Sequence, residues 1–175
     1  MESYTYTPAR SKINVRLFLF LAVVSAPFIW GAYVGAQYLL SGGVTDLGGM
    51  KKVDLKALGF FNFDSHNGTV NDVPPQFRKL DGQRVVLEGF MYDPTNSVRV
   101  KHFQFVYNIT KCCFSGPPLV QERVFANCAP GKSLPYTSNY VQLIGTLHVN
   151  VQKNEVGDIT SVYTMDVERA IPLRG

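Results

Sequence analysis

The chain lacks the short motifs that mark several large enzyme classes. The sequence FSG at 114–116 has no preceding glycine, so it is not the G-x-S-x-G turn of serine hydrolases. The sequence GKS at 131–133 resembles the end of a P-loop, but Ala126 stands where the first glycine is required. Asp166 and Glu168 share one strand face and are expected to face solvent. These absences favour a non-enzymatic protein.

Charged residues are missing from the longest apolar run of the chain, residues 17–40. A bilayer core about 30 Å thick needs about 20 apolar residues, at a rise of about 1.5 Å each. The run therefore predicts one transmembrane helix, with a kink at Pro27. A cleaved signal peptide is the alternative. The apolar run exceeds the roughly 7–15 residues usual in such peptides, so we expect a retained anchor.

The distribution of charge around this run predicts its orientation. Arg10, Lys12 and Arg16 precede the run, whereas the first basic residue after it is Lys51. Positive charge close to a membrane stays on the cytoplasmic side. We therefore expect residues 1–16 to form a cytoplasmic tail and the rest of the chain to lie on the outer side.

The chain beyond the span is close to neutral. Three of the 17 basic residues and one of the 13 acidic residues precede it, which leaves 14 basic and 12 acidic residues. Nucleic-acid binding requires clustered Lys and Arg on one face. We expect no nucleic-acid partner.

Residues 41–79 show only a weak pattern and are predicted to be a connector. Phe60, Phe61 and Phe63 lie within it, and we expect them to pack on the following domain or to lie in the lipid interface. From residue 80 onward the apolar residues recur with a period of two, which is typical of β-strands. Residues 80–175 are therefore predicted to form the folded domain.

Five strands are predicted in this domain. Their expected ranges are 84–91, 99–109, 119–125, 141–151 and 159–167. Gly89 is expected to form a bulge or a sharp bend. A small closed barrel removes exposed sheet edges, and the OB type is the common five-stranded solution. The fold class is thus mainly β, a five-stranded OB-like barrel after one transmembrane helix; a two-sheet sandwich is the alternative.

Three cysteines are the main candidates for chemistry, and they lie in two loops of the predicted domain. On the outer side of a membrane, Cys128 could form a disulfide with Cys112 or Cys113. Thiolates also suit zinc or copper(I), and three cysteines with one histidine would complete a tetrahedral site. The candidate ligands are Cys112, Cys113, Cys128 and His148. The spacing lacks the C-x-x-C pattern of zinc knuckles, so disulfide and metal remain open alternatives.

Two stretches of the domain resemble the domain-of-unknown-function family 3299. The sequence LDGQRV at 80–85 followed by GFM at 89–91 is similar to the opening of that family's domain. A strand running into a loop with cysteines and prolines, at 103–118, is similar as well. The likeness covers about residues 72–147. Many members have a histidine two residues after the cysteine, where this chain has Ser115.

The resemblance implies a bacterial exported or membrane-anchored protein. It places the expected span in the inner membrane and residues 41–175 in the periplasm. Some family members are encoded beside ABC-type export or metal-handling systems, and the Cys-Cys pair at 112–113 is similar to loops of barrel domains attached to zinc-regulated permeases. We expect a non-enzymatic accessory domain that binds a metal or a transporter; the alternative is a thiol redox protein using Cys112 or Cys113.

Overall fold

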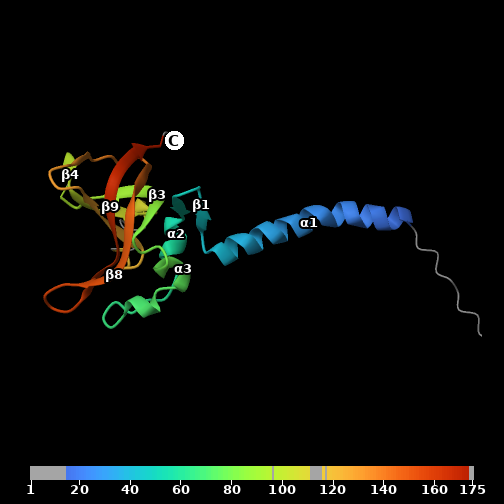
Figure 1. Cartoon of the computed structure of the whole chain (residues 1–175), viewed down its shortest axis with the longest axis horizontal. Helices are drawn as coiled ribbons and strands as arrows, with labels where there is room; N and C mark the ends of the chain where they lie inside the picture. Colours follow the sequence, from blue (N-terminus) through green and yellow to red (C-terminus); the bar gives the residue numbers. More distant parts are fainter. Residues whose placement is uncertain (1–14, 96, 111–115, 117, 174–175) are drawn as a thin grey trace, which may run out of the picture. The chain divides into compact units, whose positions relative to one another are not determined.

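The computed structural model describes residues 15–95, 97–110, 116 and 118–173, and the chain divides into two units after Leu40 (Figure 1). The first unit contains helix α1 (Val15–Ser41) except for its last residue; the helix is 27 residues long and contains Pro27. Its segment Leu19–Ala36 has a mean hydropathy of 1.8, and none of it is buried. By length and composition, α1 is therefore able to cross a membrane, as the uncharged run predicts.

The second unit, Ser41–Gly175, is mainly β, and its described residues include the short helical elements α2, η1 and α3. Its elements follow the chain as β1 (Val44–Asp46), β2 (Lys51–Val53), α2 (Leu55–Leu58), η1 (Val70–Asp72), α3 (Pro75–Arg78), β3 (Gln83–Tyr92), β4 (Arg99–Val100), β5 (His102–Val106), β6 (Arg123–Cys128), β7 (Leu134–Pro135), β8 (Val141–Lys153) and β9 (Ile159–Pro172).

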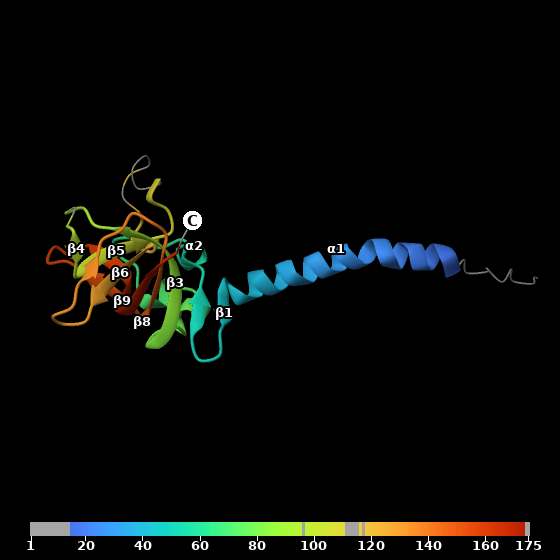
Figure 2. The ribbon, with the colours of Figure 1, turned by 90° about the horizontal axis from the view of Figure 1, so that it is seen from above.

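Seven of these strands form one mixed sheet in the order β1-β2-β3-β5-β6-β9-β8, and β4 pairs separately with β7. Figure 2 shows β5, β6, β9 and β8 beside one another. Most pairs are antiparallel, but β2 runs parallel to β3 and β6 runs parallel to β9. The sheet is thus mixed. β6 and β9 can run parallel because the chain between them passes through β8 and not through a tight hairpin.

Strand β3 has two partners, and the change of partner occurs at Gly89. Residues Gln83 to Gly89 pair with β8, whereas Phe90 to Tyr92 pair with β5. A Cβ atom on Gly89 would lie 2.6 Å from the carbonyl oxygen of Val106. Glycine is therefore required where β3 passes from one neighbour to the other, in agreement with the bend predicted there. Through these pairings, the hydrogen-bonded order β3-β5-β6-β9-β8 returns to β3.

Strand β8 carries the alternation that the sequence predicts. Along Val141–Val149, every second residue is buried, and the residues between them are half-buried. The strand has a register shift at Gly145, where a Cβ atom would lie 2.1 Å from the carbonyl oxygen of Asp166 on β9. The alternation places one face of β8 in the core, as period-two patterns do.

The strand expected at 119–125 begins later than predicted. Residues Leu119 to Glu122 form a turn, in which the Glu122 backbone N–H donates to the Leu119 carbonyl at 2.9 Å. The Leu119 backbone N–H in turn donates to the Glu122 carboxylate at 3.2 Å. Because this turn occupies the apolar start of the segment, β6 pairs only from Arg123 onward. Strand β9 also continues beyond the expected end, to Pro172.

The segment predicted as a connector, residues 41–79, packs with the strands that follow it. Strand β2 pairs with β3, and five apolar side chains of the segment are almost fully buried in the common core. These side chains are Val53, Leu55, Leu58, Val73 and Phe77. The Tyr163 hydroxyl on β9 donates to the Leu58 carbonyl at 3.1 Å, which ties the segment to the last strand. The folded unit therefore begins at the last residue of α1, Ser41, and not at residue 80.

Candidate functional site

Cys128 ends strand β6 and packs against the core of the second unit. Its Sγ lies 3.6 Å from the Val100 carbonyl oxygen, to which the thiol donates, and its side chain is only partly accessible. Burial raises the pKa of the Cys128 thiol. Metal ligation and thiol redox chemistry both need the thiolate, so this environment does not favour either role for Cys128.

His148 lies on the opposite face of the sheet from Cys128. The buried neighbours of His148 along β8 are Leu147 and Val149, so the imidazole points outward, where its Nε2 lies 3.0 Å from the Asp166 carboxylate. Cys128, by contrast, pairs with Val167 on the inward face of β9. The structure therefore does not bring these two predicted ligands together. In the part of the chain that the structure describes, no group of three or more His, Cys, Asp and Glu residues is arranged to hold a metal.

Cys112 and Cys113 lie outside the described residues, so their predicted role as metal ligands stays a prediction. Strand β5 ends at Val106 and β6 begins at Arg123, and the Cys-Cys sequence lies between them. The same connection ends in the turn from Leu119 to Glu122. Whatever the two cysteines contact, the chain enters and leaves their loop at neighbouring antiparallel strands.

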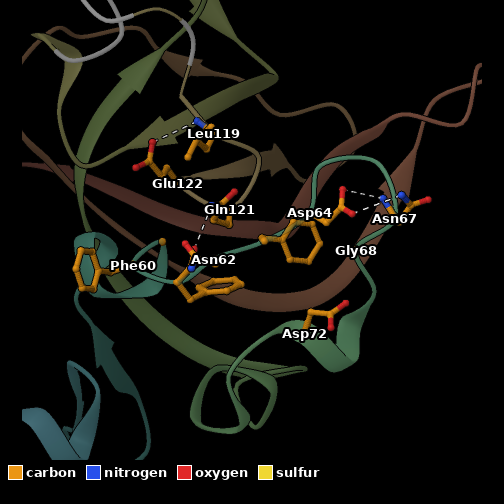
Figure 3. A pocket seen from close by; sticks show the side chains of 12 residues that line it. Phe60, Asn62, Asp64, Asn67, Gly68, Asp72, Leu119, Gln121 and Glu122 are labelled. Carbon is orange, nitrogen blue, oxygen red and sulfur yellow. Dashed lines mark hydrogen bonds between the residues drawn. The ribbon is translucent and has the colours of Figure 1, made fainter.

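A pocket of about 900 Å³ that sequence reasoning missed lies beside the end of this connection (Figure 3). We call it the Phe pocket. Twelve residues from the segment before β3 and from the turn before β6 line it: Gly59, Phe60, Phe61, Asn62, Phe63, Asp64, Asn67, Gly68, Asp72, Leu119, Gln121 and Glu122. Phe60, Phe61 and Phe63, close together in the sequence, were the only signal for this pocket. Nothing in the sequence shows that residues 119–122 lie against them.

Aromatic rings line part of the Phe pocket. Phe61 and Phe63 pack edge to face, with ring centroids 6.0 Å apart and an interplanar angle of 82°, and both contact the core. Phe60, in contrast, is 86% exposed. The expectation that these phenylalanines pack on the domain is thus correct for Phe61 and Phe63, while Phe60 projects into solvent.

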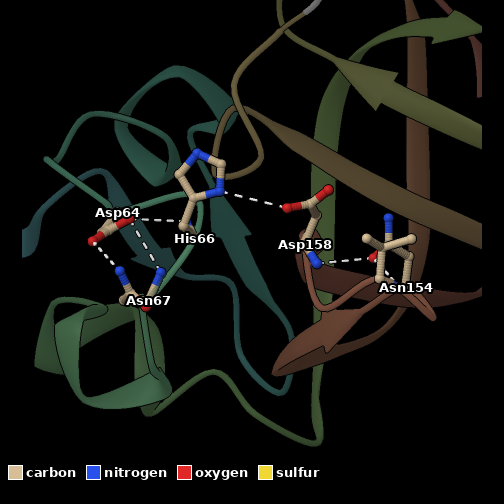
Figure 4. Close-up of polar contacts among 6 residues, drawn as sticks. Asp64, His66, Asn67, Asn154 and Asp158 are labelled. Carbon is tan, nitrogen blue, oxygen red and sulfur yellow. Dashed lines mark hydrogen bonds and ion pairs between the residues drawn. The ribbon is translucent and has the colours of Figure 1, made fainter.

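A hydrogen-bonded turn at residues 64–68 lines another part of the Phe pocket, and Figure 4 shows its polar contacts. The Asp64 carboxylate accepts hydrogen bonds from the backbone N–H groups of His66 and Asn67, at 2.8 Å and 3.1 Å. These bonds lower the pKa of Asp64, so its carboxylate stays ionised at neutral pH. A Cβ atom on Gly68 would lie 2.5 Å from the Phe63 ring, so the turn closes on that ring only with glycine at this position.

The same turn is attached to the loop between β8 and β9. The backbone N–H of Ile159 donates to the Ser65 carbonyl at 3.4 Å, and the His66 Nδ1 lies 3.5 Å from the Asp158 carboxylate. Figure 4 shows the His66 ring directed at Asp158, whose backbone N–H donates to the Asn154 side chain at 2.8 Å. The turn at residues 64–68 is therefore fixed both by hydrogen bonds within itself and by contacts with the loop between β8 and β9.

A second, smaller hollow of about 500 Å³ adjoins Cys128. Lys132, Thr146, Asp166 and Glu168 are among the residues that line it. Glu168 already forms a two-fold hydrogen bond with the Arg84 guanidinium, at 2.7 Å and 2.9 Å, and Asp166 contacts His148. Its acidic groups are thus matched by neighbouring basic side chains.

Comparison with known proteins gives a likeness among solved structures. No family model and no curated protein matches the chain. The chain is similar to the crystal structure, at 2.45 Å resolution, of a DUF3299 family protein from Pseudomonas aeruginosa PAO1. The sequences are 20% identical, the alignment covers 69% of this chain and 74% of that one, and the TM-score is 0.46. The family that the sequence resembles is thus also the family of this solved structure.

Proposed function

We propose that this protein is a non-enzymatic accessory protein, anchored in the inner membrane by α1, whose β unit is an OB-type barrel in the periplasm. In this proposal the barrel binds a metal ion or a membrane partner, such as an ABC-type or metal transporter, through the loop that contains Cys112 and Cys113. The observation that carries the proposal is the direct connection between a helix able to span a bilayer and a complete β core, with β1 starting three residues after Ser41.

The order of strand pairing supports the barrel. We number the five strands in chain order: β3 is 1, β5 is 2, β6 is 3, β8 is 4 and β9 is 5. Neighbouring strands in the sheet then follow the order 1-2-3-5-4, and strand 4 pairs again with strand 1. This is the strand order of OB-type barrels, with the third and fifth strands parallel as β6 and β9 are. Such a closed order leaves few unpaired strand edges, which suits a small domain without a covering helix layer.

The short connection to α1 supports a role beside a membrane protein. Only Gly42 and Gly43 separate the end of α1 from β1, and two residues span at most about 7 Å. In this proposal, the short tether keeps a partner embedded in the same membrane within reach of the β unit.

Reporter fusions test the proposed location. Alkaline phosphatase fused after Gly175 is active only in the periplasm, whereas a fluorescent protein that folds only in the cytoplasm reports the opposite side. We expect an active phosphatase fusion, because the three basic residues before the span hold the N-terminus in the cytoplasm. A fluorescent fusion at the same position would contradict the proposed orientation.

Elemental analysis of the purified full chain tests the role of the Cys-Cys loop. Zinc or copper should co-purify and should be lost in Cys112→Ser and Cys113→Ser. Cys128→Ser is the matched comparison, because the partly buried Cys128 thiol already donates to the Val100 carbonyl. The redox alternative gives a different result: no stoichiometric metal, and a thiol at 112 or 113 that reacts rapidly with alkylating reagents at neutral pH.

A further inference from the structure

We propose that the Phe pocket docks an arginine or lysine side chain carried by an extended segment of a partner protein. The proposal rests on the accessory function proposed above, and it names the contact by which the β unit recognises its partner. The aromatic lining and the negative charge of this pocket carry the inference; the Cys-Cys loop is not needed for it.

The aromatic lining provides a surface for the apolar part of such a side chain. The edge-to-face arrangement of Phe61 and Phe63 fixes the two rings relative to each other, and the core contacts hold them in place. Phe60 adds a ring that is 86% exposed. Exposed aromatic surface beside a hollow is typical of a binding site, and cations are attracted to the faces of such rings.

The charge of the lining selects a cation. Among the described residues of the lining, the charged ones are Asp64, Asp72 and Glu122, and none is a lysine, arginine or histidine. Figure 3 shows Glu122, Asp64 and Asp72 on separate sides of the pocket. Three carboxylates around aromatic rings repel an anion and attract a positively charged group.

The carboxylates are arranged to attract a cation at a distance and not to coordinate a bare metal ion. Asp64 accepts backbone hydrogen bonds from His66 and Asn67. Asp72 accepts hydrogen bonds from the backbone N–H and the hydroxyl of Thr69, at 2.8 Å and 2.9 Å. Glu122 accepts the backbone N–H of Leu119. These bonds fix each oxygen within its own turn, whereas a delocalised guanidinium above an aromatic ring needs only the surrounding negative potential.

The position of the pocket in the chain joins it to the proposed contact face. Leu119 and Glu122 close the connection that contains Cys112 and Cys113, and Leu119 follows Cys113 by six residues. A volume of about 900 Å³ is larger than one basic side chain needs, so flanking residues of the partner also fit. An extended peptide segment is therefore the occupant to which size and charge both point.

Titration of fluorescent peptides into the full chain in detergent tests this inference. The probes are acetyl-Leu-Arg-Leu-amide and its neutral counterpart acetyl-Leu-Gln-Leu-amide, each with the same label, followed by fluorescence anisotropy. We expect saturable binding of the arginine peptide that weakens as salt is added, because screening reduces the attraction of the carboxylates. The glutamine peptide should bind at least several-fold more weakly.

Two substitutions locate the binding, and each has a matched control. Phe60→Ala and Glu122→Gln should each weaken the arginine peptide by roughly two- to fivefold, the range expected for one exposed cation–π contact or one exposed charge pair. Val98→Ala removes an equally exposed apolar side chain elsewhere, and Glu155→Gln removes an exposed carboxylate in the loop between β8 and β9. Both controls should bind the arginine peptide as the unaltered chain does.

Several results would overturn the inference. Equal binding of the two peptides removes the role of charge, and unchanged binding in both Phe60→Ala and Glu122→Gln places the contact elsewhere. If spermidine displaces the arginine peptide at equal molar concentration, the pocket is a site for small cations. If the chain dimerises in sedimentation experiments and Phe60→Ala abolishes the dimer, the occupant is a second copy. The topology and metal results are independent of these outcomes, so failure here leaves the proposed function standing.

Discussion

Strand β8 and the segment 41–79 both supply fully buried side chains to one core, yet only the strand shows this in its sequence. In β8, Leu143 and Leu147 are buried in strict alternation with half-buried residues. In the segment, Leu58 and Phe77 are buried just as deeply, but each comes from a helical turn of four residues. A turn this short is too brief to show a period, so burial there leaves no pattern to read.

The largest effect is expected where β8 and β9 approach most closely. Gly145→Val should lower the free energy of unfolding by about 3 kcal/mol or more, because its Cβ would meet the backbone of Asp166, which cannot rotate away. Urea unfolding of the detergent-solubilised chain, followed by far-ultraviolet circular dichroism, measures this loss. The neighbouring Thr146→Ala serves as the control and should cost less than about 1 kcal/mol. Equal costs for both variants would show that the strands can separate at this point.

The next effect compares the two regions directly. Leu58→Ala and Leu147→Ala should each destabilise the β unit by about 2–5 kcal/mol, since both side chains are almost completely buried. Leu47→Ala, at a position 51% exposed in the same segment as Leu58, should change the stability very little. If Leu58→Ala proves as mild as Leu47→Ala, the segment is a separate connector and the comparison fails.

A smaller effect concerns the hydrogen bond that joins the two regions. Tyr163→Phe removes the bond from the hydroxyl to the Leu58 carbonyl and should cost about 1 kcal/mol at neutral pH. Tyr136→Phe, at a half-buried position, is the control.

Burial also makes this bond pH-dependent, because it raises the pKa of Tyr163 above its usual range. Above about pH 10 the unfolded chain loses this proton while the folded chain keeps it, so stability falls as pH rises. The difference between the unaltered chain and Tyr163→Phe should therefore shrink above about pH 10. A constant difference would contradict the burial of the phenol.

The smallest effect lies at the pairing of β2 with β3. Lys52 donates to the Glu88 carboxylate at 2.9 Å, and this hydrogen bond is the main cause that lowers the pKa of Glu88, with Gln142 contributing a second one. The associated stability is present above the ordinary carboxyl pKa and is lost as pH falls through the lowered one. Both side chains are partly exposed, so the contribution is at most about 1 kcal/mol. Lys52→Gln should flatten this acid dependence, whereas Lys56→Gln in the same segment should preserve it.

The prediction of strands from the sequence succeeded where one face is buried over many residues. The alternation along β8 and the start of β9 at Ile159 follow from period-two patterning. The predicted start of β6 was wrong. Leu119 is apolar, but it belongs to a turn, which the hydrogen bond from the Leu119 backbone N–H to the Glu122 carboxylate stabilises. Local hydrogen bonding of this kind competes with strand pairing and leaves no periodic signal.

The candidate metal site shows a second limit of sequence reasoning. Cysteine and histidine are chemically suitable ligands, but Cys128 on β6 and His148 on β8 lie on opposite faces of the sheet, with β9 between the two strands. Cys128 contacts the core and His148 contacts Asp166. Residue type predicts which atoms could bind a metal, and only strand register decides whether they meet. Cys112 and Cys113 remain the ligands whose role is still a prediction.

The sequence by itself determined the β class of this protein and a helix long and apolar enough to cross a membrane. Both depend on patterns along the chain: apolar residues at every second position, and an uncharged run longer than a bilayer requires. The tertiary structure alone decided that residues 41–79 belong to the core and that Phe61, Asp64 and Glu122 share one pocket. These relations join residues far apart in the chain. Only the close packing of folded elements brings them into contact.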